Sequence, residues 1–186
     1  MTRQVKRNLL LLLLNLWLLG GSSVAQRGVK EAELKSLFII NILNYVEWPK
    51  NKQSNEQLVC IYSEHPFDNS LEKLAQLSTS KSNGTIHIHY PKALAELTRC
   101  HILFISRSST KELDNVLKTA EINSILTISD LNNFAEKKGM IEFVTKNDII
   151  KLHINLSSTK AAHLNMSYLL LEIAEKVIHD KVANKE

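Results

Sequence analysis

Along residues 26–186, hydrophobic positions follow two alternating periods, which predict strands and helices in turn. Short apolar runs at 58–62, 101–105 and 124–128 have the length and β-branched content of buried strands. Apolar residues in the segments between them recur at helical spacing, and a Ser-Thr-Lys-Glu sequence can cap the helix expected over 109–120. This alternation predicts an α/β fold with a mostly parallel central sheet and helices on both faces.

Segments at the two ends of this region complete the predicted architecture. Residues 31–48 are apolar over most of a helical circumference and end before a proline, so we expect one long buried helix there. The runs 140–145 and 149–155 predict a C-terminal antiparallel hairpin. Residues 166–182 keep helical spacing, which predicts a last helix packed on the sheet. The whole pattern predicts a single-domain α/β sandwich.

The first 25 residues differ in composition from the rest of the chain. Basic residues precede an apolar run over 9–19, and Ser23 and Ala25 supply small side chains near its end. This layout predicts a cleaved secretory signal peptide over 1–25, followed by the domain at 26–186. The alternative is an uncleaved anchor, but the run has about 11 residues where a membrane span needs about 20. We therefore expect an exported, periplasmic protein.

The charge balance excludes one class of partner. The chain has 23 basic and 19 acidic residues, which gives a formal net charge of +4. Three of the basic residues and none of the acidic ones fall in the first 25 positions, so residues 26–186 carry 20 basic and 19 acidic side chains. Phosphate binding needs a concentrated basic face. This balance argues against nucleic acid as a partner.

Cys60 and Cys100 are the only cysteines in the chain. In an oxidising compartment an even count predicts one disulfide, with two separate buried thiols as the alternative. Closing a loop of about 40 residues would contribute roughly 4 kcal/mol in the chain-entropy model. The wide spacing, without a CxxC sequence, argues against zinc binding and against a thioredoxin-type redox site.

One candidate ligand site follows a predicted central strand. Ser106, Arg107, Ser109 and Thr110 lie after the strand at 101–105 and open the next helix. Ligands of open α/β sheets bind at the carboxyl ends of strands, and the start of a helix favours anions. These residues therefore predict a site for an anion or a small acid, with an ordinary capped helix start as the alternative.

The sequence contains none of the short motifs that mark common catalytic or nucleotide-binding sites, such as GxSxG, GxxxxGK[ST], HExxH or GxGxxG. His87 and His89 share one face of a predicted strand, but no third metal ligand is near them in the sequence. We therefore expect no catalytic residue, no metal and no cofactor.

Tyr45, Glu47 and Trp48, at the end of the first predicted helix, are candidates for binding a protein partner. Trp and Tyr bury a large area with few rotatable bonds, and the residues that dominate interface energetics are enriched in both. The alternative is that Trp48 packs in the domain's own core.

Seven segments of the chain, taken in order, resemble the YfiR family of periplasmic proteins and together cover nearly all of residues 31–180. The first ends the long apolar helix with Asn-Tyr-Val-Glu-Trp-Pro, the third opens a strand with a cysteine, and the fourth closes a strand with Leu-Thr-Ile-Ser-Asp. By residue number the segments are 42–49, 58–61, 99–105, 125–130, 139–141, 154–156 and 164–170.

The resemblance implies an inhibitor that acts by binding and not by catalysis. The family's best-known member binds the periplasmic sensor domain of an inner-membrane diguanylate cyclase and holds the enzyme off, and an outer-membrane lipoprotein can sequester that inhibitor. The resemblance also implies a dimeric α/β sandwich, with the family disulfide on Cys60 and Cys100. We therefore expect a homodimer that represses a membrane signalling protein.

The chain departs from that family pattern in three places, one of which is Lys138-Gly139 where the family usually has Gly-Gly. The best-known member carries a second cysteine pair near the hairpin, whereas residues 136–143 contain none. The Arg and His at the start of that protein's last helix correspond to Asn165 and Ser167, which puts a small-ligand site there in doubt. The alternative function is a periplasmic small-ligand-binding module, with its pocket near residues 106–110 or under the last helix.

Overall fold

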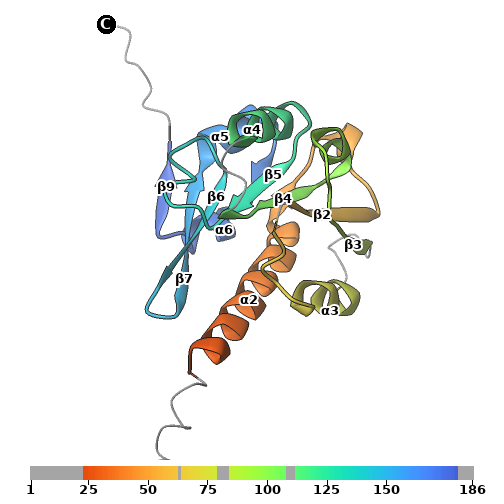
Figure 1. The fold of residues 1–186 in the computed structure, drawn as a ribbon. Helices are drawn as coiled ribbons and strands as arrows, with labels where there is room; N and C mark the ends of the chain where they lie inside the picture. The colour runs from red at the N-terminus through yellow and green to blue at the C-terminus, as the bar shows by residue number, and fades with distance from the viewer. Residues whose placement is uncertain (1–22, 63, 79–83, 108–111, 180–186) are drawn as a thin grey trace, which may run out of the picture.

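The computed structural model describes residues 23–62, 64–78, 84–107 and 112–179. Helices cover both faces of a seven-stranded sheet, with α2 and α3 on one face and α4 on the other (Figure 1). The strands of this sheet are β2 (Glu56–Tyr62), β3 (Thr85–His89), β4 (Ile102–Ile105), β5 (Leu126–Ser129), β6 (Ile141–Lys146), β7 (Ile149–Asn155) and β9 (Lys176–Ile178).

Helical segments and a second, two-stranded sheet complete the fold. The α-helices are α2 (Ser23–Ile42), α3 (Ser70–Leu77), α4 (Leu113–Ile122), α5 (Leu156–Ala161) and α6 (Tyr168–Glu172). Short 3-10 helices are η2 (Leu43–Tyr45), η3 (Lys50–Lys52) and η4 (Leu94–Arg99). The small sheet pairs β1 (Val46–Glu47) with β8 (Asn165–Met166).

The order of strands in the large sheet is β3-β2-β4-β5-β6-β7-β9. The strands from β3 to β6 are mutually parallel, β7 is antiparallel to β6, and β9 is parallel to β7. After β3 the chain crosses over β2, so the direction of strand addition reverses between β2 and β4. This arrangement confirms the predicted α/β sandwich, its mostly parallel sheet and its C-terminal hairpin.

Two apolar clusters, one on each face, hold the sheet between its helices. The side chains of β4 alternate between them: Ile102 and Phe104 join the cluster under α2 and α3, and Leu103 and Ile105 join the cluster under α4. Each of these four side chains is fully buried. Burial on both faces explains why the central strands read as continuous apolar runs.

The hairpin between β6 and β7 turns at Asn147 and Asp148, as predicted. Both residues have positive φ, 52° and 61°. Two consecutive residues of this kind match the right-handed twist of the adjoining strands, and Asn and Asp tolerate the left-handed region better than most residues. The local sequence therefore sets the register of this hairpin.

The first helix ends earlier than the sequence predicts. The apolar stripe predicts a helix to Trp48, but α2 ends at Ile42 and β1 follows. Val46 pairs with Met166 and Glu47 with Asn165 in an antiparallel ladder. The prediction is wrong at this end because a strand partner far along the chain competes with local helical spacing.

The prediction of one C-terminal helix over residues 166–182 is also wrong. Residues 166–182 contain the last residue of β8, the five-residue helix α6 and the edge strand β9. Leu170 is buried, but Tyr168 and Leu169 are exposed, and Val177 extends the sheet beside Ile154. The open edge of β7 needs hydrogen-bond partners, and the backbone of β9 supplies them.

Two further predictions meet the limits of the described residues. Residues 1–22, most of the predicted signal peptide, lie outside them, so the signal peptide stays a prediction. No helix in the described ranges is both long and apolar enough to cross a membrane. Helix α4 begins at Leu113 and the Glu112 carboxylate accepts a hydrogen bond from the Tyr62 hydroxyl at 2.9 Å, whereas the other residues of the predicted capping sequence, 109–111, lie outside the described residues.

Candidate functional site

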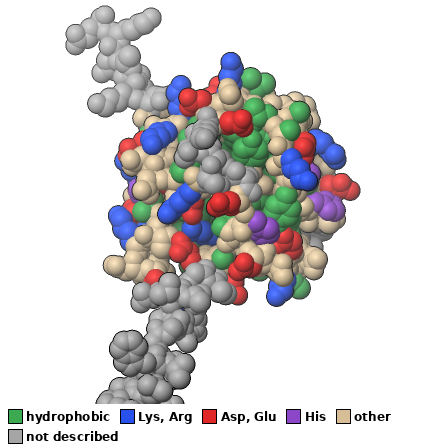
Figure 2. Space-filling view, in the orientation of Figure 1, with side chains coloured by type: hydrophobic (Ala, Val, Ile, Leu, Met, Phe, Trp, Pro, Cys, Tyr) green, Lys and Arg blue, Asp and Glu red, His purple; other side chains and the backbone are tan. Residues whose placement is uncertain are grey.

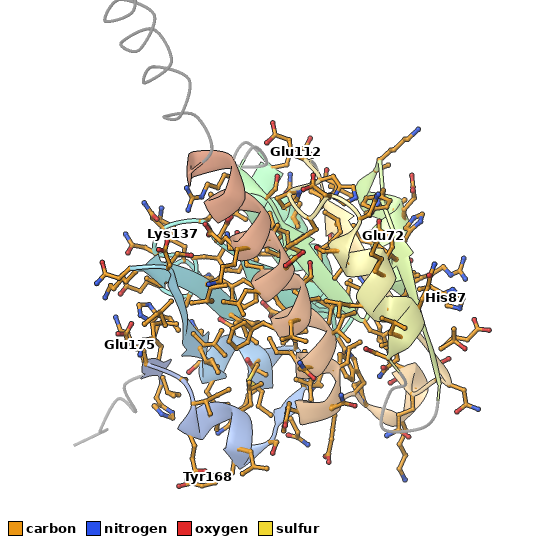
Figure 3. All side chains as sticks on the ribbon, turned by 90° about the horizontal axis from the view of Figure 1, so that it is seen from below. Glu72, His87, Glu112, Lys137, Tyr168 and Glu175 are labelled. Carbon is orange, nitrogen blue, oxygen red and sulfur yellow. A yellow bond between two sulfur atoms is a disulfide. The ribbon has the colours of Figure 1, made fainter. Side chains whose placement is uncertain are left out.

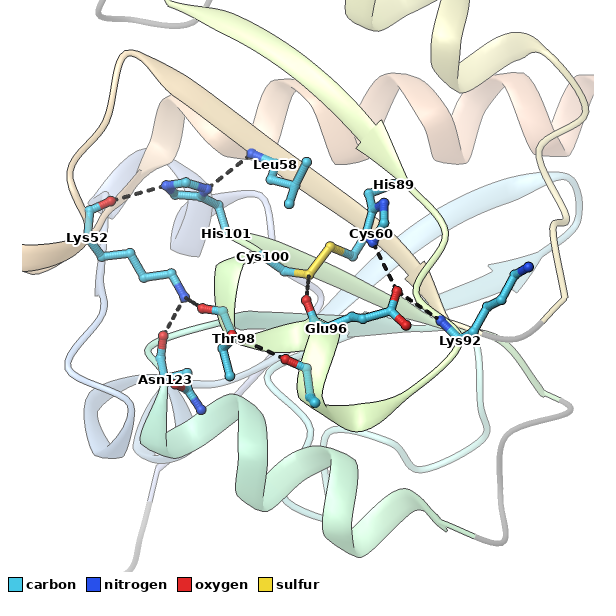
Figure 4. Close-up of a disulfide and its surroundings, with 11 residues drawn as sticks. Lys52, Leu58, Cys60, His89, Lys92, Glu96, Thr98, Cys100, His101 and Asn123 are labelled. Carbon is cyan, nitrogen blue, oxygen red and sulfur yellow. Dashed lines mark hydrogen bonds and ion pairs between the residues drawn. A yellow bond between two sulfur atoms is a disulfide. The ribbon is translucent and has the colours of Figure 1, made fainter.

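A disulfide between Cys60 and Cys100 confirms the predicted pairing. Cys60 lies in β2 and Cys100 directly before β4, and their Cα atoms are 5.9 Å apart. Both side chains are fully buried in the cluster under α4. The bond therefore links two neighbouring strands at the start of β4, in the region drawn in Figure 4.

His101, the residue after this disulfide, connects the loop before β2 to the sheet (Figure 4). Its Nδ1 accepts a hydrogen bond from the Leu58 backbone N–H at 3.0 Å, and its Nε2 lies 3.1 Å from the Lys52 carbonyl oxygen. This pattern requires a neutral ring with its proton on Nε2. Burial lowers the pKa of His101, so the ring acts as a neutral structural bridge.

Lys52, in the same loop, has a half-buried ammonium group. Its Nζ donates to the carbonyl oxygens of Thr98, at 3.3 Å, and Asn123 (Figure 4). Desolvation lowers the pKa of Lys52 to about 8. Within the described part of the chain no carboxylate pairs with this cation, so carbonyl dipoles alone stabilise its charge.

The three candidate partner-binding residues differ in exposure. Tyr45 is half-buried, Glu47 is exposed on β1, and Trp48 is only 7% exposed. The Trp48 ring meets the His101 ring edge-on with centroids 5.6 Å apart. Trp48 therefore packs in the protein's own core, which is the alternative interpretation of its sequence position. Glu47 and the exposed part of Tyr45 are the accessible side chains among the three.

An exposed apolar surface lies next to this segment in the fold. The backbone N–H of Ser167 donates to the Tyr45 carbonyl oxygen at 2.8 Å, which brings the start of α6 beside β1. Tyr168, Leu169 and Ile173 are 71%, 59% and 61% exposed, and Figure 3 shows Tyr168 at the outer surface. Sequence reasoning misses this surface, because helical spacing assigns Leu169 and Ile173 to a buried face.

The predicted ligand residues lie at the carboxyl end of β4, where the strand order reverses. Ser106 is buried, and its Oγ accepts a hydrogen bond from the Glu64 backbone N–H at 3.2 Å. Arg107 is exposed, and its Nε donates to the Asp130 carbonyl oxygen at 3.1 Å. Ser109 and Thr110 lie outside the described residues. The described pair therefore binds the protein's own groups at this end of the sheet.

A buried ion-pair cluster lies beside Arg107, and no sequence motif indicates it. The Lys35 ammonium of α2 is 2.7 Å from Asp130 Oδ2 and 2.8 Å from Glu31 Oε1. Lys35 is only 6% exposed. Its hydrogen bond is the largest cause that lowers the pKa of Glu31. The cluster joins α2 to the end of β5 and neutralises its own charges.

Histidines elsewhere are distributed over the surface. His87 is exposed on β3 and labelled in Figure 3, and His89 Nε2 lies 3.4 Å from Glu96 Oε2. His153 Nε2 is 3.2 Å from Glu175 Oε2. In the described ranges, no group of three or more His, Cys, Asp or Glu residues is placed to hold a metal ion. Basic and acidic side chains are interspersed on the face drawn in Figure 2.

One solved structure is similar to this chain in fold, and a second has a lower overall similarity. A conserved domain protein from Vibrio cholerae O1 biovar El Tor has a TM-score of 0.50 and 12% identity, over 79% of this chain and 60% of its own. The ABC domain from Streptococcus pneumonia in complex with L-Trp has a TM-score of 0.45 and 11% identity, over 66% of this chain and 55% of its own. This chain thus spans less than two thirds of either structure.

The sequence comparisons identify a family. No curated protein matches this chain. A family model described as DUF4154, YfiR/HmsC-like, matches residues 32–175. This match contains every strand of the large sheet except β9, together with the disulfide and the Lys35–Asp130 pair. The chain therefore belongs to the YfiR/HmsC-like family.

Proposed function

We propose that this protein is a periplasmic, non-enzymatic regulator that binds the periplasmic sensor domain of an inner-membrane signalling protein and represses it. Family membership over residues 32–175 carries the proposal, and a diguanylate cyclase is the signalling protein that the family suggests. The Cys60–Cys100 disulfide of this chain supports a location in an oxidising compartment.

The mechanism we propose is a shift between two states of the partner. A regulator without chemistry of its own changes an enzyme's output only by binding one state more tightly than the other. To move an equilibrium from 1:99 to 99:1, the preference for the inactive state must be about 10⁴-fold. The regulator therefore acts stoichiometrically, and an outer-membrane lipoprotein that sequesters it would restore the signal.

The surface formed by Glu47, the exposed part of Tyr45 and α6 is our candidate for the contact with the sensor domain. Large apolar and aromatic side chains dominate the energetics of protein interfaces, and Tyr168, Leu169 and Ile173 are more than half exposed. Self-association through part of this surface would produce the homodimer that the family suggests, and light scattering of the purified protein would measure it.

Deletion of the gene in its host tests the function and does not require the partner to be identified. We expect cellular cyclic-di-GMP to rise on deletion and to return to its starting level when the full chain is supplied. A chain that starts at Gln26, without the leader, should fail to restore it, since it would not reach the periplasm. Unchanged cyclic-di-GMP on deletion would contradict the proposal.

Surface variants separate repression from folding. Tyr168→Lys should lose repression, because a charge then replaces the exposed aromatic ring of α6. Glu121→Lys, at an exposed position of α4 on the opposite face of the sheet, is the matched control and should repress normally. Circular dichroism should show both variants folded. Equal repression by the two variants would exclude α6 from the contact.

A further inference from the structure

A polar cavity lies at the amino ends of β2, β4 and β5, opposite the end that carries Ser106 and Arg107. Its volume is about 650 Å³, within the range of small-molecule sites. Lys52, Gln57, Arg99 and His101 contribute to its lining. A second cavity of about 560 Å³ shares Lys52, Gln57 and His101 with it and extends to Trp48.

The cations of this cavity lack carboxylate partners. The Lys52 ammonium donates two of its three N–H groups to carbonyl oxygens. The Arg99 side chain makes no hydrogen bond or ion pair with another described residue. Glu56 is the acidic residue in the lining, and it forms no ion pair with either cation in the described part of the chain. The cavity therefore offers unpaired N–H donors on two positive side chains.

One residue of the cavity lining also carries a hydrogen-bond acceptor without a partner. The Gln57 side-chain oxygen, Oε1, is buried and accepts no hydrogen bond from the described residues. A buried carbonyl oxygen without a donor costs about 1–3 kcal/mol, so native proteins rarely leave one in this state. An ordered water or a ligand hydroxyl or amine would satisfy it.

We propose that this cavity binds a small organic anion that also carries a hydroxyl or amino group. Carboxylate or phosphate oxygens accept from Lys52 and Arg99, and the hydroxyl or amine donates to Gln57 Oε1 once the Gln57 amide turns toward the cavity. Charge-assisted hydrogen bonds of this kind are about twice as strong as neutral ones. The low pKa of Lys52, caused by desolvation alone, agrees with a site that lacks its counter-ion.

Thermal unfolding and calorimetric titration with three probes test the site. L-malate carries carboxylates and a hydroxyl, succinate lacks the hydroxyl, and inorganic phosphate is the simplest anion. At about 10 mM and pH 7, L-malate should raise the Tm of the full chain by about 3 °C or more, which corresponds to a Kd of about 1 mM or below. Succinate should bind more weakly, because it offers Gln57 no donor.

Matched variants assign the effect to the cavity. Lys52→Met keeps the length of the side chain without its charge, and it should abolish the shift. Lys50→Met changes an exposed lysine of the same 3-10 helix, outside the cavity lining, and should respond like the wild type. Gln57→Leu should make malate and succinate bind equally. The shifts, and not the absolute Tm values, are compared, so a change in basal stability does not affect the result.

Two results would overturn the proposal. One is the absence of a shift with all three probes in the wild type, which would leave an ordered water as the partner of Gln57. The other is an equal shift in Lys52→Met and Lys50→Met, which would mean that the anion binds elsewhere. Succinate binding as tight as that of malate would remove the role of Gln57 and with it the second half of the proposal.

Discussion

The two ends of the parallel sheet differ in the partners of their positive side chains. At the carboxyl end, Lys35 lies between Asp130 and Glu31 at hydrogen-bond distances, and Arg107 bonds to Asp130. At the amino end, the half-buried Lys52 contacts two carbonyl oxygens, and the exposed Arg99 pairs with no described side chain. At the carboxyl end, carboxylates of the chain compensate the positive charges. At the amino end, the positive charges of Lys52 and Arg99 have no carboxylate partner in the described residues.

This difference shows why strand topology alone does not locate a site. The carboxyl end beside the reversal of strand order is where α/β sheets commonly bind ligands. Here the protein's own ion pairs occupy it. A buried ammonium with carboxylate partners is a structural element, whereas one held only by dipoles retains an affinity for anions. Charge compensation, read residue by residue, therefore distinguishes the two ends better than topology does.

The disulfide supports the amino end, and its removal should have the largest effect on stability. Cys60→Ser together with Cys100→Ser should lower the free energy of unfolding by about 4 kcal/mol, because the bond closes a 40-residue loop. Urea denaturation measures the change. Reduction of the wild type should give a comparable loss, and a loss below about 1 kcal/mol in both would mean that the bond constrains little.

The next largest effect should come from breaking the ion pairs at the carboxyl end. Lys35→Met should destabilise the protein by about 3 kcal/mol, because it leaves carboxylates without their buried partner. Lys52→Met at the amino end is the comparison variant, and it should change stability by no more than about 1 kcal/mol, since no carboxylate loses a partner. Equal losses in the two variants would remove the contrast between the ends.

His101 should make the amino end sensitive to acid. Its pKa is lowered in the folded protein by burial, so below the ordinary value near 6.5 the unfolded chain binds more protons than the folded one. Stability should therefore fall as pH decreases through that region, with a limit of about 1.4 kcal/mol per pH unit for one proton. Denaturation at several pH values measures the slope, and His101→Gln, with an acceptor and a donor of its own, should reduce it.

Lys52 should produce the smallest effect, at alkaline pH. Its pKa is about 8 in the folded protein and 10.5 in the reference state, so between these values the unfolded chain holds the extra proton. Stability should rise with pH across this window, by less than the shift alone implies because the side chain is only half-buried. Comparison of the wild type with Lys52→Met at both ends of the window checks the sign. A slope that survives in the variant would have another origin.

Much of the fold could be predicted because its signals are local. The central strands are continuous apolar runs since both faces are covered, and Asn147-Asp148 marks a turn through its own backbone preferences. The prediction of a buried last helix is wrong. It rested on the helical spacing of Leu169, Leu170 and Ile173, but two of these three side chains are exposed. That spacing gives no sign that the edge of β7 pairs with a further strand.

The sites were less predictable, because they depend on residues that are distant in sequence. Lys35 and Asp130 come into contact only when α2 packs across the end of β5. No short sequence motif indicates this pair. Lys52 acquires its environment from Thr98 and Asn123, in two other parts of the chain. Trp48 could be recognised as a large apolar residue, but only the fold shows that it lies in the core, where its ring contacts the His101 ring.

The pairing of β1 with β8 has a consequence for how the chain reaches its final shape. In this ladder Val46 pairs with Met166. The ladder therefore cannot form until the ribosome has synthesised almost the whole chain. Contacts between remote segments also form slowly. The β1–β8 ladder therefore belongs among the last contacts of the fold to form, after the large sheet has the strands from β2 to β7 available.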